Sequence, residues 1–433
     1  MAKVEPPSGT RDFVGDEVRR RKLAFDRVST IFEHHGFQPL TTPVFERLEV
    51  FAGKLGEEAS SLIFKILKRG VHEATGEADL ALRYDHTVPA VRAVVTHGSR
   101  LSLPFKRYVI DNVWRADRAA RGRFREFVQC DIDIFGSASP LADAEIVWAI
   151  NSGLEALGVK EFVFQLNSRL ALAGLLEAYG IPDELGTRVL GSLDKLDKAA
   201  PEVVVAELVE RGLTTTVAES LVADVIAPDS ERVRQQLGAT ERGRDGLAEV
   251  DRLLALAEDL PAGRVRFTPR MVRGLDYYTG PIWEVSAAGY PGSIASGGRY
   301  DQLVAKLGGP DMPACGGSIG LERILAIQEA EAPMEQGLDV ALTVLGAERE
   351  IVSLAGQLRA RGLRTAVYLG SSGKLAKQMK WANEQRARWV LLYGPDEQER
   401  RTVTVRDMES GEQSQVAFDD VAANLADRMA SKP

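Results

Sequence analysis

Polar and apolar side chains alternate strictly through the segment 128–135, which reads VQCDIDIF. If this segment is a strand, its polar side chains share one face: Gln129, Asp131 and Asp133. In an extended conformation, the segment LRYDHT also places three polar side chains on one face: Arg83, Asp85 and Thr87. Buried carboxylates need a cation or several donors, so two acidic strand faces suit a ligand that carries an ammonium group. For either segment alone, a solvent-exposed sheet face is the alternative interpretation.

Arginine is the second residue type whose placement suggests chemistry. The motifs VWRAD, RGLDYYTG and GGSIGLERI contain Arg115, Arg273 and Arg323. Arginine stays charged at any working pH and presents a planar fork of donors, so it is the expected clamp for nucleotide phosphates. Five of the eleven residues in 115–125 are arginine, and a solvated loop is the alternative for that cluster. The sequence has no Walker A motif and no G-x-G-x-x-G turn between a strand and a helix.

The elements that hold these motifs follow from the apolar periodicity. Residues 16–35 have apolar side chains at helical spacing and stop at a glycine, which predicts a first helix. The segments 103–114 and 128–135 are typical of strands. From about 141 to 262 the sequence is rich in helix-forming residues, and strand-like segments return only afterwards. These patterns indicate a helical segment inserted between two halves of a sheet.

A further boundary falls near 328–337, where the sequence reads QEAEAPMEQG. Beyond it, short apolar strands alternate with helices in a β-α-β-α-β order, from DVALTVL to WVLLYG. This rhythm predicts a small, mainly parallel α/β domain.

Composition limits the remaining possibilities. The 433 residues, 45% of them hydrophobic, suffice for two or three domains, and a net charge of -8 restricts any nucleic-acid contact to local clusters. Cys130 and Cys315 have no paired spacing and are interpreted as buried thiols, and the five histidines lack the spacing of a helix-borne metal site. Without a signal peptide pattern or an apolar run of about eighteen residues, we expect a cytoplasmic protein with no membrane span.

Segments spread through nearly the whole chain together resemble histidyl-tRNA synthetases. They are PPSGTRDF, PLTTPVFE, LRYDHTVPAVR, the stretch from FKRYVIDNVWR to DIDIFG, LDKLDK, RGLDYYTGPIWEV, ASGGRYDQLV, GGSIGLERIL and GKLAKQMKWAN. RGLDYYTG is the most specific of these. PVFE, the stretch from VWR to DIDIFG, and GLERI correspond to class II synthetase motifs one, two and three, which are less specific individually.

The resemblance implies an α+β class II synthetase fold. The catalytic domain, 1–327, is expected to be a six-stranded antiparallel sheet flanked by helices, with a mostly helical insertion at about 168–262. A linker at 328–336 is expected to lead to an α/β anticodon-binding domain at 337–433. Motif one, around Pro43, is expected at the interface of an isologous homodimer.

The resemblance also implies a histidine pocket. The matching positions are Asp85, Thr87, Gln129, Asp133, Tyr277 and Tyr278. Asp85, Thr87 and Gln129 are expected at the ammonium and carboxylate end of L-histidine. Asp133 and the two tyrosines are expected near the imidazole, whose nitrogens need polar partners if histidine is to be selected.

Three arginines match contacts with ATP in this family. Arg115 matches the motif two arginine that grips the α-phosphate, and Arg273 matches one that faces this phosphate from the opposite side. Arg323 matches the motif three arginine at the far phosphates. Arg115 and Arg273 are the expected catalytic residues, because fixed cations stabilise the charge that develops when the histidine carboxylate attacks that phosphate. Mg²⁺ is expected with ATP rather than in a protein cage, and tRNA(His) is the expected acceptor.

Two departures from the family pattern narrow these expectations. Asp85 and Asp133 stand where many bacterial members have glutamate, which puts the size of the pocket in doubt more than its chemistry. Ala119 stands where relatives often have proline in the motif two loop, so recognition of an extra 5′ guanylate on the tRNA is not predicted.

Two other functions are alternatives. A non-catalytic histidine-binding paralogue, like the regulatory subunit of ATP phosphoribosyltransferase, typically lacks the Arg273 signature and the C-terminal domain, and this chain has both. A prolyl, threonyl or glycyl synthetase shares motifs one to three, but RGLDYYTG argues against these enzymes.

Overall fold

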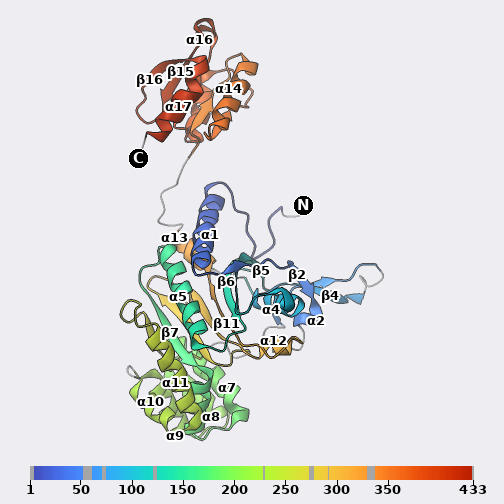
Figure 1. Cartoon of the computed structure of the whole chain (residues 1–433), viewed down its shortest axis with the longest axis vertical. Helices are drawn as coiled ribbons and strands as arrows, with labels where there is room; N and C mark the ends of the chain where they lie inside the picture. Colours follow the sequence, from blue (N-terminus) through green and yellow to red (C-terminus); the bar gives the residue numbers. More distant parts are fainter. Residues whose placement is uncertain are drawn as a thin grey trace. The chain divides into compact units, whose positions relative to one another are not determined.

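The chain divides into two compact units, Met1–Ala332 and Pro333–Pro433, which are drawn in Figure 1. Each unit has its own sheet and its own hydrophobic core. The computed structural model describes residues 4–51, 61–70, 75–119, 124–227, 230–272, 277–290, 292–328 and 337–431.

The main sheet of the larger unit has eight strands within these residues. In spatial order they are β1 (Gln38–Pro39), β5 (Phe105–Trp114), β6 (Glu126–Phe135), β11 (Ala314–Ile319), β10 (Ala295–Arg299), β9 (Pro281–Ala287), β7 (Phe162–Ser168) and β8 (Val265–Phe267). The six central strands pair antiparallel, whereas β1 and β8 pair parallel with their neighbours at the two edges. The expected six-stranded antiparallel sheet is therefore present, and two short parallel strands extend it to eight.

The predicted first helix is confirmed as α1 (Asp16–His34), which buries Ala24, Val28 and Phe32 at a spacing of four residues. It lies beside α5 (Pro140–Ala156) on one face of the main sheet (Figure 1). The apolar side chains of β6, such as Ile132, pack into the core beneath these helices. The predicted alternation along β6 is confirmed, because its polar side chains face the other way.

A smaller layer covers part of the opposite face. It contains the antiparallel strands β2 (Phe45–Arg47), β4 (Ala78–Leu82) and β3 (Lys65–Leu67), and the helices α2 (Leu48–Phe51), α4 (Thr87–His97), η2 (Gly98–Arg100) and α12 (Leu303–Lys306). Its apolar residues pack with Phe105 and Phe135 of the main sheet in a second core. This layer carries α4 to the polar face of β6.

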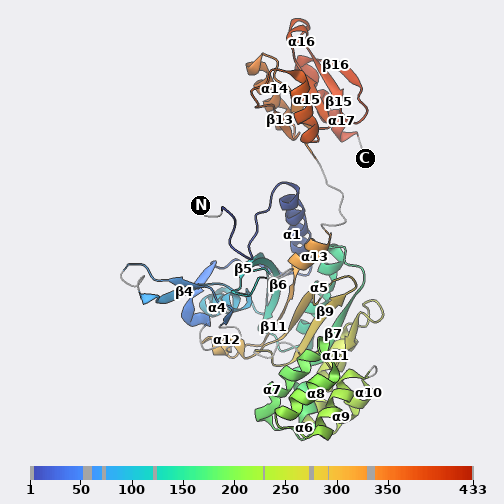
Figure 2. The same ribbon diagram turned by 180° about the vertical axis from the view of Figure 1, so that it is seen from behind.

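A helical segment follows β7 and ends before β8. Its helices are α6 (Arg169–Ala178), α7 (Asp183–Leu193), η3 (Asp194–Asp197), α8 (Pro201–Glu210), α9 (Thr215–Ile226), α10 (Glu231–Gly238) and α11 (Glu241–Leu256), which Figure 2 shows gathered at one end of the larger unit. Glycines let α6 and α11 approach closely, since a Cβ on Gly246 would lie 2.1 Å from the amide nitrogen of Ala171. The composition of residues 141–262 predicts strands only after 262, but β7 lies within this range because Phe162 and Phe164 pack into the core of the main sheet.

The smaller unit has a five-stranded sheet in the order β13-β12-β14-β15-β16. Its elements are β12 (Val340–Leu342), α14 (Glu348–Ala360), β13 (Thr365–Val367), α15 (Leu375–Glu384), β14 (Trp389–Leu392), α16 (Pro395–Arg400), β15 (Thr402–Asp407), β16 (Gln413–Ala417), η4 (Phe418–Asp420) and α17 (Val421–Ala430). β12 pairs parallel with β13 and β14, as predicted, but β15 and β16 add two antiparallel pairings. The sheet is therefore mixed rather than mainly parallel.

The two cysteines are confirmed as buried free thiols, and burial raises the pKa of both Cys130 and Cys315. The expected linker at 328–336 lies, apart from Gln328, outside the described residues. In the part of the chain that the structure describes, no helix is both long enough and apolar enough to cross a membrane.

Candidate active site

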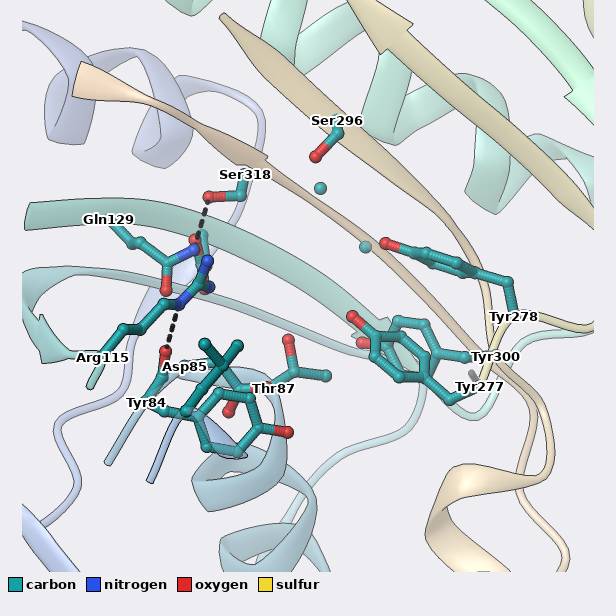
Figure 3. Close-up of a pocket in the computed structure, with 14 residues that line it drawn as sticks. Tyr84, Asp85, Thr87, Arg115, Gln129, Tyr277, Tyr278, Ser296, Tyr300 and Ser318 are labelled. Atoms are coloured by element: carbon teal, nitrogen blue, oxygen red, sulfur yellow. Dashed lines mark hydrogen bonds between the residues drawn. The ribbon is translucent and has the colours of Figure 1, made fainter. Parts of the chain in front are cut away.

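A cavity of about 240 Å³ lies over the polar face of the main sheet (Figure 3). Its lining residues come from seven separate stretches of the chain, so the cavity exists only in the folded unit. The lining residues are Leu62, Tyr84, Asp85, Thr87, Arg115, Gln129, Asp131, Tyr277, Tyr278, Ser296, Tyr300, Gly316, Gly317 and Ser318.

Gln129 and Asp131 reach the cavity from β6, which lies between β5 and β11. Asp131 pairs in register with Ser318 of β11, and Gln129 Nε2 lies 3.5 Å from Ser318 Oγ. Gln129 Oε1 and Asp131 Oδ1 are buried and have no hydrogen-bond partner among the described residues. Because unsatisfied buried acceptors cost free energy, this pair favours a ligand that brings hydrogen-bond donors.

Asp85 and Thr87 reach the cavity from the start of α4 rather than from a strand. The extended conformation considered for LRYDHT is wrong beyond Leu82, where β4 ends. Asp85 Oδ1 accepts a hydrogen bond from the Val88 amide at 3.2 Å, and Pro89 occupies the first turn of the helix. An acid at a helix start with a proline just inside it is a helix signal, and here it overrides the alternation.

Three tyrosines form the opposite wall of the cavity, as Figure 3 shows. The ring centroid of Tyr277 lies 4.7 Å from that of Tyr278 and 5.7 Å from that of Tyr300, and the planes of Tyr277 and Tyr300 are perpendicular. Edge-to-face aromatic contacts of this kind fix the orientation of the rings. The wall therefore offers a flat ligand a preformed aromatic surface with hydroxyl groups.

Asp133 lies behind the tyrosine wall and is not a lining residue. Its carboxylate accepts a hydrogen bond from the Tyr300 hydroxyl and forms an ion pair with Arg107 of β5. Burial raises the pKa of Asp133, while the Arg107 charge and the Tyr300 hydrogen bond oppose that rise. A Cβ on Gly316, directly across on β11, would come within 2.2 Å of Asp133 Oδ1, so a side chain there would displace this carboxylate.

The two acids that line the cavity titrate near neutral pH. Burial raises the pKa of Asp131 to about 7, although the Arg107 charge and a hydrogen bond from Ser318 act against it. Burial also raises the pKa of Asp85 to about 6, although the Val88 amide stabilises its ionised form. Because a nearby positive charge favours ionised carboxylates, a cationic group entering the cavity would lower the pKa of both.

Arg115 lines the cavity directly after the end of β5. Its Nε donates to the Tyr84 carbonyl oxygen at 3.0 Å, and its guanidinium carbon lies 5.2 Å from the centroid of the Phe127 ring. Its amide donates to the Arg125 carbonyl at 2.8 Å, which closes the base of the segment 115–125. The structure thus places a fixed cation on the same side of the cavity as Gln129 and Ser318 (Figure 3).

Arg323, which the structure describes, does not line this cavity. Arg323 is exposed on α13 (Leu321–Gln328), and its guanidinium donates to the Ser293 carbonyl. Arg273 lies outside the described residues, as do Arg121 and Arg123 of the arginine cluster. The roles expected for Arg115, Arg273 and Arg323 stay predictions.

Sequence reasoning did not single out Tyr300, Ser296 and Ser318 as lining residues. Their strands reach the cavity through pairings between distant segments, such as β6 with β11, which local periodicity does not reveal. Asp131 did carry a local signal, because it shares a strand face with Gln129 and Asp133. No group of three or more His, Cys, Asp or Glu side chains within the described ranges could hold a metal ion.

Comparison with known proteins places this site in a family. A model of histidyl-tRNA synthetase matches residues 9–324, and a model of an anticodon binding domain matches residues 339–428. The histidine–tRNA ligase of Gloeobacter violaceus is 37% identical over 469 aligned positions, covering 100% of both chains. That of Christiangramia forsetii is 35% identical and covers 98% of this chain and 99% of its own.

Solved structures agree with this result. The crystal structure of histidyl-tRNA synthetase from Nostoc sp. PCC 7120 has a TM-score of 0.81 at 28% identity, with 99% of this chain and 100% of that chain covered. An ATP phosphoribosyltransferase regulatory subunit/histidyl-tRNA synthetase from Bacillus halodurans has a TM-score of 0.73 at 22% identity, covers 88% of this chain and 97% of that one, and shares the fold alone. The expected class II synthetase fold is confirmed, and the chain belongs to the histidyl-tRNA synthetase family.

Proposed function

We propose that this protein is a histidine–tRNA ligase that activates L-histidine with ATP and transfers it to the 3′ end of tRNA(His). The observation that carries the proposal is the polarity of the cavity. Asp85, Asp131 and Gln129 supply acceptors on one side, and the tyrosine wall supplies an aromatic surface on the other. An amino acid with an ammonium group and a flat ring matches both ends, and a volume of about 240 Å³ suits so small a ligand.

The ammonium group of histidine is proposed to lie between Asp85 and Asp131, with Thr87 and Gln129 as further partners. We add Asp131 to the set expected from the sequence, because this acid lines the cavity and has a buried oxygen without a hydrogen-bond partner among the described residues. An ammonium ion there would satisfy buried acceptors and would favour the ionised carboxylates.

The imidazole is proposed to stack within the tyrosine wall, close to Tyr277 and Tyr278. Tyr300 donates its hydroxyl proton to Asp133, so its oxygen is left to accept a hydrogen bond from an imidazole N–H. Asp133 would then select histidine through Tyr300, and Arg107 would hold Asp133 in place. A site built around such polar partners discriminates strongly against analogues that lack the matching group.

The first chemical step is proposed to be attack of the histidine carboxylate on the α-phosphorus of ATP. The new carboxylate–phosphorus bond gives histidyl-adenylate, and pyrophosphate leaves with the electron pair of the broken P–O bond. Arg115 and Arg273 are proposed to stabilise the negative charge on the α-phosphate oxygens, and Arg323 to bind the distal phosphates. Magnesium would arrive with ATP as part of that substrate and would offset the charge of its phosphates.

The second step is proposed to be attack of the terminal ribose hydroxyl of tRNA(His) on the carbonyl carbon of histidyl-adenylate. The new ester bond forms, AMP leaves with the electron pair of the broken carbon–oxygen bond, and the hydroxyl proton is released. The match of residues 339–428 to an anticodon binding domain supports a contact between the smaller unit and the tRNA. A homodimer formed through motif one around Pro43 and a cytoplasmic location belong to the same proposal.

Amino-acid-dependent ATP–pyrophosphate exchange tests this function, with histidine, proline, threonine and glycine supplied separately. We expect exchange with histidine alone. Arg115→Ala should lower that exchange by roughly 10²–10³-fold while histidine still binds, because a fixed donor to the developing charge is lost. Arg232→Ala removes an exposed arginine and is the matched control.

Other outcomes would assign the protein differently. Histidine binding without any exchange would identify a binding protein rather than an enzyme. Exchange with proline, threonine or glycine in place of histidine would contradict the proposed specificity.

A further inference from the structure

The segment that precedes α1 is attached to the returning end of the motif two segment. The Gly9 carbonyl accepts hydrogen bonds from the amides of Arg125 at 2.8 Å and Glu126 at 3.3 Å. Gly9 has a positive φ of 85°, and a Cβ there would lie 2.8 Å from Arg125 Cγ, so this contact requires glycine. The Arg125 carbonyl oxygen accepts a hydrogen bond from the Arg115 amide, and Arg125 Nε donates a hydrogen bond to the Asp117 carbonyl oxygen at 2.8 Å. The position of Arg115 therefore depends on a strand end that the N-terminal segment holds.

Arg11 extends this attachment to motif three. Its guanidinium carbon lies 3.6 Å from the centroid of the Phe124 ring, immediately before Arg125. The same guanidinium donates to Glu322 Oε2 at 2.5 Å. Glu322 is the residue before Arg323 at the start of α13. One side chain thus contacts both the motif two segment and the motif three helix.

Glu322 is held from several directions. Besides Arg11, it accepts hydrogen bonds from both terminal nitrogens of Arg21 on α1 and from the Val128 amide of β6 at 3.3 Å. Its side chain is only 8% exposed. Although burial opposes ionisation, the Arg21 hydrogen bonds and the charges of Arg21 and Arg11 hold the pKa of Glu322 below its usual value. The carboxylate is therefore an ionised junction between α1, β6, α13 and the N-terminal segment.

We propose that Arg11 is a positioning residue that fixes Arg115 and Arg323 relative to each other, through Phe124 and Glu322, for attack on the α-phosphate of ATP. This inference rests on the proposed function. The two arginines are more than two hundred residues apart in sequence, and no described contact joins them directly. Preorganised charges stabilise a transition state only when they are already in place, and a misplacement of about 1 Å can cost on the order of 10²-fold in rate.

Arg11 and Arg21 bind the same carboxylate, but their burial and hydrogen bonds indicate different roles. The Arg21 side chain is 9% exposed and makes two hydrogen bonds to Glu322 within the core, so it stabilises the fold. The Arg11 side chain is 28% exposed and, among the described residues, makes one side-chain hydrogen bond, to Glu322. Removing Arg11 leaves Glu322 paired with Arg21, and the folded structure should survive this change.

The test compares Arg11→Met, Arg11→Lys and a matched control, Arg19→Met, which removes an exposed arginine of α1. Histidine-dependent pyrophosphate exchange, calorimetric binding of histidine and of ATP, and thermal unfolding are measured for each variant. We expect Arg11→Met to lower kcat of exchange by roughly 10–100-fold and to weaken ATP binding, with the histidine Kd and Tm close to wild type. Arg11→Lys should restore only part of the loss, because an ammonium group keeps the ion pair but lacks the planar face that stacks on Phe124. Arg19→Met should match wild type.

Several results would overturn the inference. Exchange within twofold of wild type in Arg11→Met would do so, as would a parallel loss of histidine affinity and Tm, which indicates a purely structural role. If wild-type protein shows no exchange with any amino acid, the proposed function fails, and ATP binding then decides the role of Arg11. In that case, unchanged ATP affinity in Arg11→Met, or no ATP binding by the wild-type protein, would reject the positioning role of Arg11.

Discussion

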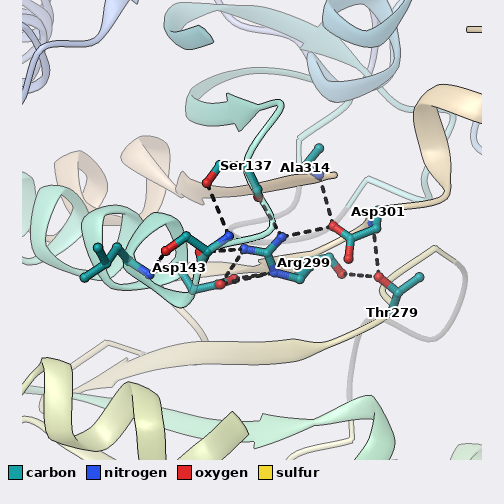
Figure 4. Close-up of polar contacts among 8 residues, drawn as sticks. Ser137, Asp143, Thr279, Arg299, Asp301 and Ala314 are labelled. Atoms are coloured by element: carbon teal, nitrogen blue, oxygen red, sulfur yellow. Dashed lines mark hydrogen bonds and ion pairs between the residues drawn. The ribbon is translucent and has the colours of Figure 1, made fainter. Parts of the chain in front are cut away.

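Two regions of the main sheet, one around Arg299 and the other in the cavity, differ in how their buried charges are paired. Around Arg299 of β10, charges and donors are matched within the protein (Figure 4). Arg299 donates to Asp143 of α5, to Asp301 at 3.0 Å, and to the backbone carbonyls of Ser137 and Ser139. Asp301 Oδ1 also accepts a hydrogen bond from the Ala314 amide at 3.1 Å.

In the cavity, by contrast, the hydrogen-bond donors to the acids are uncharged, and the positive charges of Arg107 and Arg115 act on Asp131 and Asp85 without a direct ion pair to either acid among the described residues. Asp85 accepts a hydrogen bond from the Val88 amide, and Asp131 accepts one from Ser318. The other oxygen of Asp131, Oδ1, has no hydrogen-bond partner among the described residues. A paired charge holds neighbouring elements together, whereas an acid short of partners raises the free energy of the empty site and favours a cationic ligand. The comparison therefore predicts that substitutions in the first region change stability and that substitutions in the second change binding.

Arg299→Met gives the largest expected effect, because it leaves Asp143 buried without its cation. We expect the free energy of unfolding to fall by about 3–5 kcal/mol, the usual result of breaking a buried ion pair from one side. Urea unfolding followed by circular dichroism measures this loss. Arg401→Met is the matched control, since Arg401 and Asp419 form an exposed pair, and its stability should stay unchanged. A loss below about 1 kcal/mol for Arg299→Met would break the comparison, because the first region would then not stabilise the fold.

The two regions also differ in how far the sequence predicts them. The period-two pattern of β6 predicts that Gln129 and Asp131 share a face, because the direction of a strand side chain is a local property. Asp143 and Arg299 are 156 residues apart, and nothing in the sequence beside either one indicates the other. Such a pairing depends on strand order and register, which local patterns do not contain.

Within the cavity, too, local sequence motifs predict some lining residues, whereas contacts between distant strands are not predicted. Family motifs led to Asp85, Thr87 and Arg115, all of which line the cavity. Tyr300 was missed, because its role follows from contact with Asp133 across neighbouring strands. Asp133 itself was expected beside the imidazole, but the structure places it behind Tyr300. Its predicted role in selecting histidine stays a prediction.

Asp131→Asn tests the second region through pH. The folded protein binds more protons at Asp131 than the unfolded chain between about pH 4 and pH 7, because burial raises its pKa from 3.8 to about 7. The free energy of unfolding of the empty protein should therefore fall as pH rises through this window, by up to about 4 kcal/mol for this group at about 1.4 kcal/mol per pKa unit. Histidine affinity should change in the opposite direction, since the ionised acid attracts the ammonium group.

Asp131→Asn should flatten both pH profiles. Unfolding in urea and calorimetric binding of histidine are measured from pH 4.5 to pH 8, a range of about the width of this titration. Asp419→Asn, an exposed acid, should keep the wild-type profiles. Protonation of the imidazole of histidine is common to all variants, so the difference between profiles isolates Asp131. Parallel profiles for Asp131→Asn and wild type would show that this acid does not titrate as its burial predicts.

Ser318→Ala should give the smallest effect of these substitutions, a change in the pH at which Asp131 titrates. The Ser318 hydroxyl donates to Asp131 and lowers its pKa against the larger effect of burial. Without this donor the pKa should rise further, and the midpoint of the pH dependence of histidine binding should move upward. The shift should be less than about one pH unit, because such a hydrogen bond contributes roughly 0.5–1.5 kcal/mol. Ser296→Ala is the control within the same cavity and should leave the midpoint in place. An equal shift in both variants would mean that cavity polarity in general, rather than this hydrogen bond, sets the charge that meets the ligand.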